Sequence, residues 1–435
     1  MSNVTKHVLD NGMTVLLKEV HAAPVVSWWV LYRIGSRNER TGQTGISHWV
    51  EHMMFKGTEQ FPRQELEKMI DRQGGSWNAQ TSFDYTAYFE TMPADRIDLA
   101  LRLEADRMQN VAFLPEEVES ERTVIISERQ GSENSPMFWL SEEMNAAAFR
   151  VHGYHHEIIG DMIDLETMTR DDLYNHYRTY YAPNNAVAVV VGAFDTEDML
   201  ARIKELYGSI PARELPRTFV RPEPEQIGER RVKVERPGTT AFLEMSFRSP
   251  AGNHPDYFKL AVLISVLTGP SGPGGGNIDN KTSRLYRALV ETGIAASADG
   301  SLYPSLDPFL MSLTVTVSEG HTLEEAEAEL EVQLERVRSG DITEAEVAKA
   351  KKQARASFAY STEGVTGQAF WLAFCENIDS YTWFEEYIDR LDAVTLADVV
   401  EVAEKYLRPQ NRVVGWLVPT GMGEDDDMEG DEDGE

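Results

Sequence analysis

Two stretches of the chain follow the same pattern, and this repeat constrains the fold more than any other feature. MTRDDLYNHYRTYYAPNNAVAVVVG, residues 168–192, aligns without a gap with VTLADVVEVAEKYLRPQNRVVGWLV, residues 394–418. A weaker echo links LPEEVESER at 114 with ITEAEVAKA at 342. Identical pairs at one constant offset include Leu165 and Leu391, Thr169 and Thr395, Tyr180 and Tyr406, Pro183 and Pro409, and Asn185 and Asn411. We therefore expect a chain built from two similar halves.

Each copy of the repeat predicts a helix, a turn at the proline and then a buried strand, because a β-branched run such as Val187–Val191 follows the turn. Each half therefore mixes strands and helices, which is an α+β pattern. Four prolines and many charges in residues 209–228 break both periodicities and predict a linker. The halves are then 1–208 and 229–420, and the acidic run 421–435 is predicted to be a disordered tail.

Composition narrows the possible partners and the compartment. The formal net charge of −31 over 435 residues disfavours nucleic acid and anionic membranes, and it favours basic peptides. The sequence has no uninterrupted apolar run of transmembrane length and no secretory leader pattern, so we expect a cytoplasmic protein. The single cysteine, Cys375, excludes an internal disulfide framework and any multi-cysteine metal site. A metal in this chain must be held by histidine and carboxylate.

The stretch ISHWVEHMMFKG, residues 46–57, has the residue types of such a site. The apolar spacing predicts a helix from about Gly45, on which His48 and His52 share one face and Glu51 lies beside them. A catalytic zinc site needs three protein ligands and an open position, so a third ligand must come from elsewhere. Two histidines on a surface helix are the alternative, and the five-residue pattern alone does not exclude it.

A second stretch, EVESERTVIISERQGS, predicts a helix that places Glu121 and Glu128 on one side, two turns apart. The apolar run at 124–126 predicts that this helix is buried, where a carboxylate without a cation would be costly. Glu128 is therefore the candidate third ligand, and Glu121 is the candidate for a supporting position behind the ligands.

HWVEH followed by ERTVIISE resembles the inverted zinc motif of the pitrilysin/insulinase family of metallopeptidases, which includes mitochondrial processing peptidase. The resemblance covers nearly the whole chain. It extends through LDNGMTVLLKE, GGSWNAQTSFDYTAYF, HGYHHEIIGDMIDLETMT, YYAPNNAVAVVVG and SRLYRALVETGIA. It implies two similar halves, each a mixed, mostly antiparallel sheet packed by helices.

The resemblance also implies roles for individual residues. Zn²⁺ would be held by His48, His52 and Glu128, with Glu51 as general base and Glu121 as a supporting acid. The segment WNAQT resembles the family's edge strand, where Asn78 and Ala79 would face the main chain of an extended peptide substrate. The implied reaction is hydrolysis of peptide bonds in unfolded peptides or short polypeptides, inside a closed chamber.

The chain departs from the family in its second half. Active members have an arginine and, seven residues later, a tyrosine in a stretch resembling LREKRGLAY, whereas LVETGIAAS at 289–297 has Val290 and Ala296 there and is one residue shorter. Arg284 and Tyr286 belong to the preceding SRLY match and do not substitute. We therefore expect a heterodimer with a homologous subunit that lacks the zinc motif, with a homodimer as the alternative. A presequence-type processing protease and a non-catalytic assembly subunit are the alternative functions.

Overall fold

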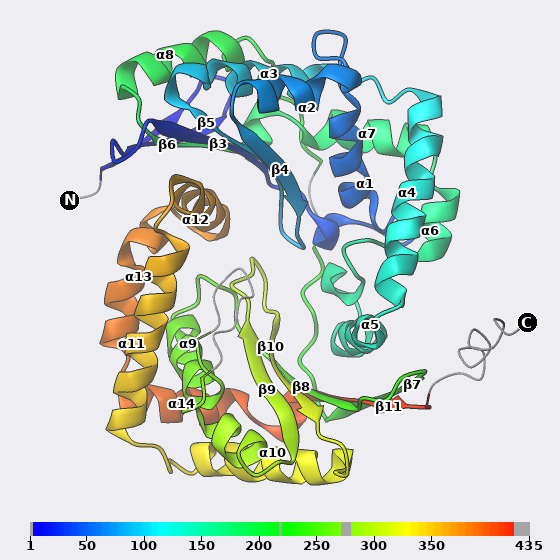
Figure 1. The fold of residues 1–435 in the computed structure, drawn as a ribbon, viewed down its shortest axis with the longest axis vertical. Helices are drawn as coiled ribbons and strands as arrows, with labels where there is room; N and C mark the ends of the chain where they lie inside the picture. Colours follow the sequence, from blue (N-terminus) through cyan, green and yellow to red (C-terminus); the bar gives the residue numbers. More distant parts are fainter. Residues whose placement is uncertain (1–2, 217–219, 271–279, 422–435) are drawn as a thin grey trace, which may run out of the picture. The chain divides into compact units, whose positions relative to one another are not determined.

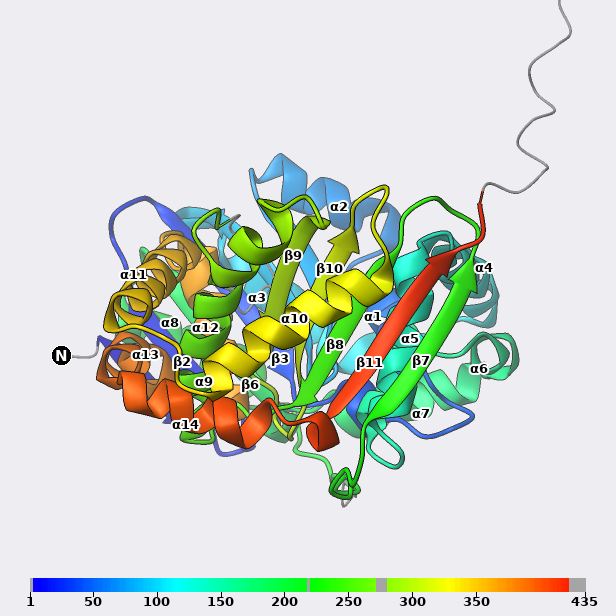
Figure 2. The ribbon, with the colours of Figure 1, turned by 90° about the horizontal axis from the view of Figure 1, so that it is seen from below.

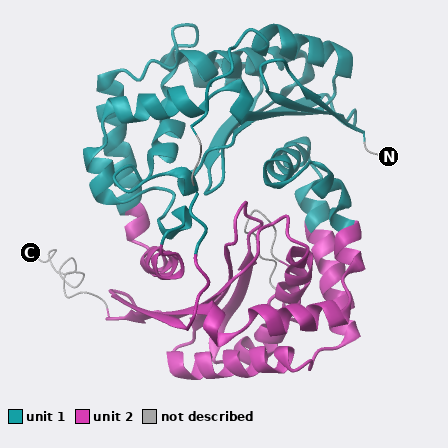
Figure 3. Ribbon diagram, turned by 180° about the vertical axis from the view of Figure 1, so that it is seen from behind, with its two compact units in different colours: residues 1–130, 151–223, 358–388 teal, residues 131–150, 224–357, 389–435 magenta. Residues whose placement is uncertain are grey.

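The computed structural model describes residues 3–216, 220–270 and 280–421, and these residues form two compact units (Figure 1, Figure 3). The first unit comprises residues 1–130, 151–223 and 358–388, and the second comprises 131–150, 224–357 and 389–435. The units differ from the predicted halves by an exchange of segments. Helix α5 (Pro136–Ala148) packs on strands of the second unit, and helix α12 (Val365–Ile378) packs on strands of the first. Local periodicity predicts a helix but not the sheet against which it packs.

The first unit contains a six-stranded sheet in the order β1-β2-β6-β3-β5-β4. β2 and β6 are parallel, and the other neighbours are antiparallel. Asn11 and Gly12 form the turn between β1 and β2, where Gly12 has φ +85°. The strands are β1 (Val4–Val8), β2 (Thr14–Glu19), β3 (Val25–Tyr32), β4 (Ser76–Thr81), β5 (Thr86–Pro93) and β6 (Ala186–Gly192).

Helices cover this sheet and close its hydrophobic core. The core includes Trp28 from β3, Trp49 and Met53 from α1, and Tyr177 from α7, all fully buried. Helix α1 packs against β4, β5 and α7, so the helix that carries His48 and His52 is fixed by the core. Besides α12, the helices are α1 (Ile46–Met53), α2 (Arg63–Arg72), α3 (Asp98–Asn110), α4 (Pro115–Glu133), α6 (Met162–Thr167), α7 (Arg170–Tyr180), α8 (Thr196–Tyr207) and α13 (Thr382–Ala393).

The second unit contains a five-stranded sheet in the order β7-β11-β8-β10-β9 (Figure 2). Only the β7–β11 pair is parallel among these neighbours. The strands are β7 (Arg230–Arg236), β8 (Phe242–Arg248), β9 (Ala295–Leu302), β10 (Leu310–Val317) and β11 (Arg412–Pro419). The helices are α9 (Asp256–Leu267), α10 (Leu323–Arg338), α11 (Glu344–Ser361) and α14 (Leu396–Tyr406), with a π-helical turn at Tyr286–Val290.

The sequence repeat corresponds to a structural repeat. Thr169 and Thr395 cap α7 and α14, each in a reciprocal box with the aspartate three residues later. The side chain of Asn185 donates to the carbonyl of Tyr180 at 2.9 Å, and Asn411 donates to that of Tyr406 at 3.0 Å. The order β2-β6-β3-β5-β4 in one sheet matches β7-β11-β8-β10-β9 in the other, including the single parallel pair. The predicted fold class is confirmed.

The predicted linker and tail add no regular structure to the described residues. Residues 211–216 and 220–228 contain no helix or strand. Apart from Gly421, the predicted acidic tail lies outside the described residues. Within the described ranges, every helix is too short or too polar to cross a membrane.

Candidate metal centre

Helix α1 begins at a tightly constrained corner. Gly45 precedes it with φ +84°, and a Cβ atom at this position would lie 2.3 Å from the carbonyl oxygen of Ile159. The carboxylate of Glu39 accepts hydrogen bonds from the main-chain N–H groups of Gly45 and Ser47, both at 2.8 Å. These N–H groups have no partner within the helix, and the negative charge of Glu39 also suits the positive end of the helix dipole. The start of helix α1 is therefore fixed by the left-handed conformation of Gly45 and by the hydrogen bonds to the Glu39 carboxylate.

The structure brings the three predicted ligands together. Nε2 of His52 lies 3.6 Å from Oε2 of Glu128, and Nε2 of His48 lies 3.9 Å from the same oxygen. One possible ligand atom from each residue lies within 4.8 Å of the other two. In the described part of the chain, this is the one group of three His, Cys, Asp or Glu residues close enough to share an ion.

The donor set fits zinc. Two imidazoles and one carboxylate form a set that catalytic zinc uses, with a fourth position left for water or substrate. Burial lowers the pKa of His48 to about 3, with a smaller contribution from His52, so its imidazole is neutral as a ligand must be. Nδ1 of His48 is buried and has no hydrogen-bond partner, although ligating histidines usually donate from the second nitrogen.

The environment of Glu128 differs from the predicted one. Its side chain is 47% exposed, and Val124 on the same helix is 46% exposed, whereas Ile125 is fully buried. The prediction that the apolar run buries this helix around Glu128 was therefore wrong. Helix α4 packs only one face against the core. The apolar run 124–126 includes Ile125 on that face and Val124 on the exposed side. Nearness to the two imidazoles, and not burial, identifies Glu128 as the third candidate ligand.

Glu121 is the buried acid on α4, at 5% exposure. Its Oε1 lies 2.9 Å from Nδ1 of His52, and its other oxygen forms an ion pair with Lys56. A proton on Nδ1 of His52, donated to Glu121, leaves Nε2 free to face Glu128. Burial alone would raise the pKa of Glu121, but the hydrogen bonds from His52 and Lys56 lower it. This contact places Glu121 where it can orient His52, and Glu121 is not in the group of residues close enough to share an ion.

Glu51 remains outside the group of ligands. It is 8% exposed, and its Oε2 accepts a hydrogen bond from Oγ1 of Thr81 at 2.5 Å. Burial raises the pKa of the Glu51 carboxyl, although the Thr81 hydrogen bond opposes the shift. A carboxylate with a raised pKa is better suited to accept and return a proton near neutral pH.

Asn78 and Ala79 lie on β4, which pairs with β5 alone among the described strands and so has a free edge. Asn78 is exposed, and its Oδ1 accepts a hydrogen bond from the N–H of Ala79 at 2.9 Å. The side chain of Ala79 instead packs against the hydrophobic core. Its main chain, and not its side chain, is therefore what a substrate could pair with.

A brace that sequence reasoning missed joins the two helices of the centre. Asp164 accepts hydrogen bonds from the N–H groups of Gly42 and Thr44 and from the Thr44 hydroxyl, at 2.7 to 3.0 Å, just before α1. From α4, Arg122 donates to the carbonyls of Leu165 and Met168, and Arg129 donates to that of Gly160. Segment 160–168 thus connects α1 with α4. Its sequence signal, an acid in the short helix α6, lies far along the chain from both helices and does not reveal this contact.

His156 supplies a pH dependence that can be tested. It is 3% exposed, and its Nε2 lies 3.0 Å from Oε2 of Glu39. Burial lowers the pKa of His156, but Glu39, Asp161 and Glu157 outweigh it, and the net pKa is raised. The stability from this pair is therefore complete below the unfolded pKa of about 6.5 and is lost as pH rises through the folded pKa.

We expect His156→Gln to cost about 1–3 kcal/mol at pH 6 and clearly less at pH 9. The measurement is urea unfolding of the variant and of the wild-type chain at both pH values. An equal cost at the two pH values would show that the pair contributes packing and not charge.

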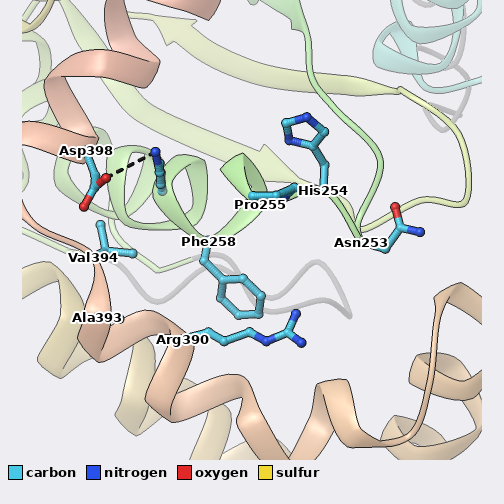
Figure 4. A pocket seen from close by; sticks show the side chains of 9 residues that line it. Asn253, His254, Pro255, Phe258, Arg390, Ala393, Val394 and Asp398 are labelled. Atoms are coloured by element: carbon cyan, nitrogen blue, oxygen red, sulfur yellow. Dashed lines mark ion pairs between the residues drawn. The ribbon is translucent and has the colours of Figure 1, made fainter.

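The second unit contains a cavity of about 470 Å³ that brings no comparable chemistry together (Figure 4). Its lining includes Lys259, which pairs with Asp398 at 3.2 Å, and Arg390, whose guanidinium lies 5.6 Å from the ring centre of Phe258. Lys259 is paired with a carboxylate and Arg390 lies on an aromatic ring, so we assign this cavity no role in the reaction.

Comparison with known proteins identifies the family. Residues 14–162 match the family model described as Insulinase (Peptidase family M16), and residues 167–354 match the Peptidase M16 inactive domain. The chain belongs to the M16, or pitrilysin/insulinase, family of zinc metallopeptidases. The predicted family is thus confirmed. The second model begins within the first half, before α7, and continues into the second half as far as α11.

Several relatives match along almost the whole chain. The zinc protease PqqE of Helicobacter pylori is 30% identical over 430 residues, which cover 96% of this chain and 94% of that protein. The beta subunit of the mitochondrial-processing peptidase of Saccharomyces cerevisiae is 26% identical and covers 94% of this chain and 89% of its own length. The crystal structure of a protease from Helicobacter pylori superposes with a TM-score of 0.90 at 28% identity, covering 96% of this chain and 99% of that one.

Proposed function

We propose that the chain is a zinc-dependent endopeptidase. The observation that carries the proposal is the meeting of His48, His52 and Glu128 within 4.8 Å, beside the buried carboxylate of Glu51. These residues supply three candidate protein ligands and a candidate base, which is the set that metal-assisted hydrolysis of a peptide bond requires. Family membership and the names of the relatives support the same reaction.

The residues of the centre divide the chemistry among them. Zinc held there would supply a Lewis acid that polarises the scissile carbonyl and acidifies water. Glu51 would take the proton from the attacking water and deliver it to the leaving amine. Glu121 would keep His52 in the tautomer that presents Nε2, with Lys56 balancing the charge of Glu121.

The free edge of β4 supports an extended peptide as the substrate. A peptide that adds to this edge gains main-chain hydrogen bonds whatever its sequence. In the described structure, the N–H of Ala79 is occupied by Asn78, so substrate would replace this contact and release the amide to bind the peptide. Only unfolded segments could pair in this way, and an enclosing chamber would further restrict the size of the substrate. The predicted cytoplasmic location rests on the sequence alone.

The second half supports the proposal that a partner subunit completes the site. Val290 ends the π-helical turn, and Ala296 is exposed on β9 at the edge of its sheet; neither can donate a hydrogen bond from its side chain. Arg284 is engaged elsewhere, because Nε and Nη2 bind the carboxylate of Glu346 at 2.7 and 2.9 Å. We propose that a homologous subunit with the arginine and tyrosine supplies these groups.

Processing of basic leader segments is the second candidate function. The net charge of −31 favours it, and one relative is a processing-peptidase subunit. Faster cleavage of basic amphipathic leaders than of neutral peptides of the same length would support this alternative. A purely structural assembly subunit is disfavoured, because all four residues proposed for the metal and the base are present.

Metal removal tests the proposal directly. We expect one zinc per chain by metal analysis, no peptide hydrolysis after chelation, and recovery of activity with stoichiometric zinc. His52→Ala and Glu128→Gln should each lose at least about tenfold in zinc affinity, since each removes a ligand. As a control, Glu133→Gln on the same helix should bind zinc like the wild-type chain. Full activity after metal removal would contradict the proposal.

A further inference from the structure

Strand β4 presents two different faces. Trp77 and Ala79 pack against the hydrophobic core, whereas Ser76 and Asn78 are exposed. Side chains alternate along a strand, so Thr81 lies on the same face as Trp77 and Ala79. That face lies against α1, which packs beside β4 (Figure 1). The last residue of the strand therefore points toward the helix that carries Glu51.

The contact that results is short and specific. Oγ1 of Thr81 donates to Oε2 of Glu51 at 2.5 Å, and Glu51 is 8% exposed. The main-chain N–H of Thr81 also hydrogen-bonds to this carboxylate. Together the two contacts restrict rotation of the carboxylate, and only the hydroxyl contact depends on the Thr81 side chain. Thr81 also lies about 7 Å along the strand from Ala79, at the spacing of about 3.3 Å per residue. A peptide paired with Ala79 would therefore extend past the base.

We propose that Thr81 is a positioning residue that couples the substrate-binding strand to the general base. Its hydroxyl fixes the Glu51 carboxylate relative to the register of a peptide on β4, so that a correctly paired peptide bond meets a correctly oriented base. This inference rests on the proposed peptidase function and adds a residue to it. A threonine at a strand end is otherwise explained by β propensity, and valine would satisfy that preference equally well.

The matched pair of variants is therefore Thr81→Val and Thr81→Ser. Valine keeps the shape and the β-branch but removes the donor, whereas serine keeps the donor. With the zinc-loaded chain and its partner, we expect Thr81→Val to lower kcat by about 10- to 100-fold with KM within about twofold, and Thr81→Ser to restore kcat to within about threefold. Thr91→Val on β5, whose hydroxyl contacts Ser27 and Thr366, is the control and should leave kcat unchanged.

A double-mutant cycle separates positioning from a general structural effect. In a Glu51→Gln background, Thr81→Val should cause little further loss of kcat, because both changes affect one function. Zinc content should be the same in all variants. Equal loss in the valine and serine variants, an additive cycle, or a loss of zinc in Thr81→Val would overturn the role of Thr81. A zinc-loaded wild-type chain without activity, alone or with its partner, would overturn the proposed function and this role together.

Discussion

Replacing Glu51 by glutamine is expected to abolish hydrolysis while leaving zinc in place. Glutamine keeps the size of the side chain and can still accept the hydrogen bond from Thr81, but it cannot take a proton from water. General base catalysis contributes about 10²- to 10⁴-fold, so kcat should fall by that factor. The measurement pairs steady-state peptide hydrolysis with zinc analysis of the same samples.

Two further measurements show that this effect is chemical. Glu51 is buried with a raised pKa, so neutral glutamine should leave the thermal unfolding midpoint of the chain within a few degrees of the wild type. Glu67→Gln, an exposed position on α2, is the matched control and should retain full activity. Loss of zinc together with unfolding in Glu51→Gln would instead assign Glu51 a structural role.

Much of the fold could be predicted because the same capping and turn residues occur in both copies of the repeat. The capping threonines at 169 and 395 and the asparagines at 185 and 411 make the same contacts in both copies. The exchange of α5 and α12 could not be predicted. Their sequences indicate helices. Which sheet each helix packs against depends on contacts with residues distant in sequence, and an amphipathic pattern does not identify those residues.

The candidate site shows a similar division. His48, Glu51 and His52 could be placed on one face because helix geometry fixes spacing over one turn. Two arguments predict Glu128: burial beside an apolar run, and the family resemblance. The structure contradicts the burial argument, since the side chain of Glu128 is 47% exposed. Glu39 and Asp164 could not be predicted, because each acts through hydrogen bonds from main-chain N–H groups. The partners of Glu39 are six and eight residues away, and Thr44, a partner of Asp164, is 120 residues away. Contacts of this kind leave no periodic trace in a sequence.

Addition of the proposed partner subunit is expected to raise the kcat of the zinc-loaded chain by about 10²- to 10³-fold. This is the effect of one preorganised donor to the developing oxyanion, and the chain has Val290 and Ala296 where the family has its arginine and tyrosine. The partner should be a homologous chain without His-x-x-Glu-His but with the arginine and tyrosine seven residues apart. Activity measured against partner concentration should saturate at one partner per chain.

The controls remove the contribution of each subunit in turn. A partner in which the arginine is replaced by alanine should still bind the chain but restore little activity, whereas Glu51→Gln in this chain should abolish the activity of the complex. If the chain instead works as a homodimer, its specific activity alone should rise with its own concentration and should equal that of the mixture. Equal rates for the chain alone and for the mixture would contradict the heterodimer, because the absent donors would then be unnecessary or already supplied within the chain.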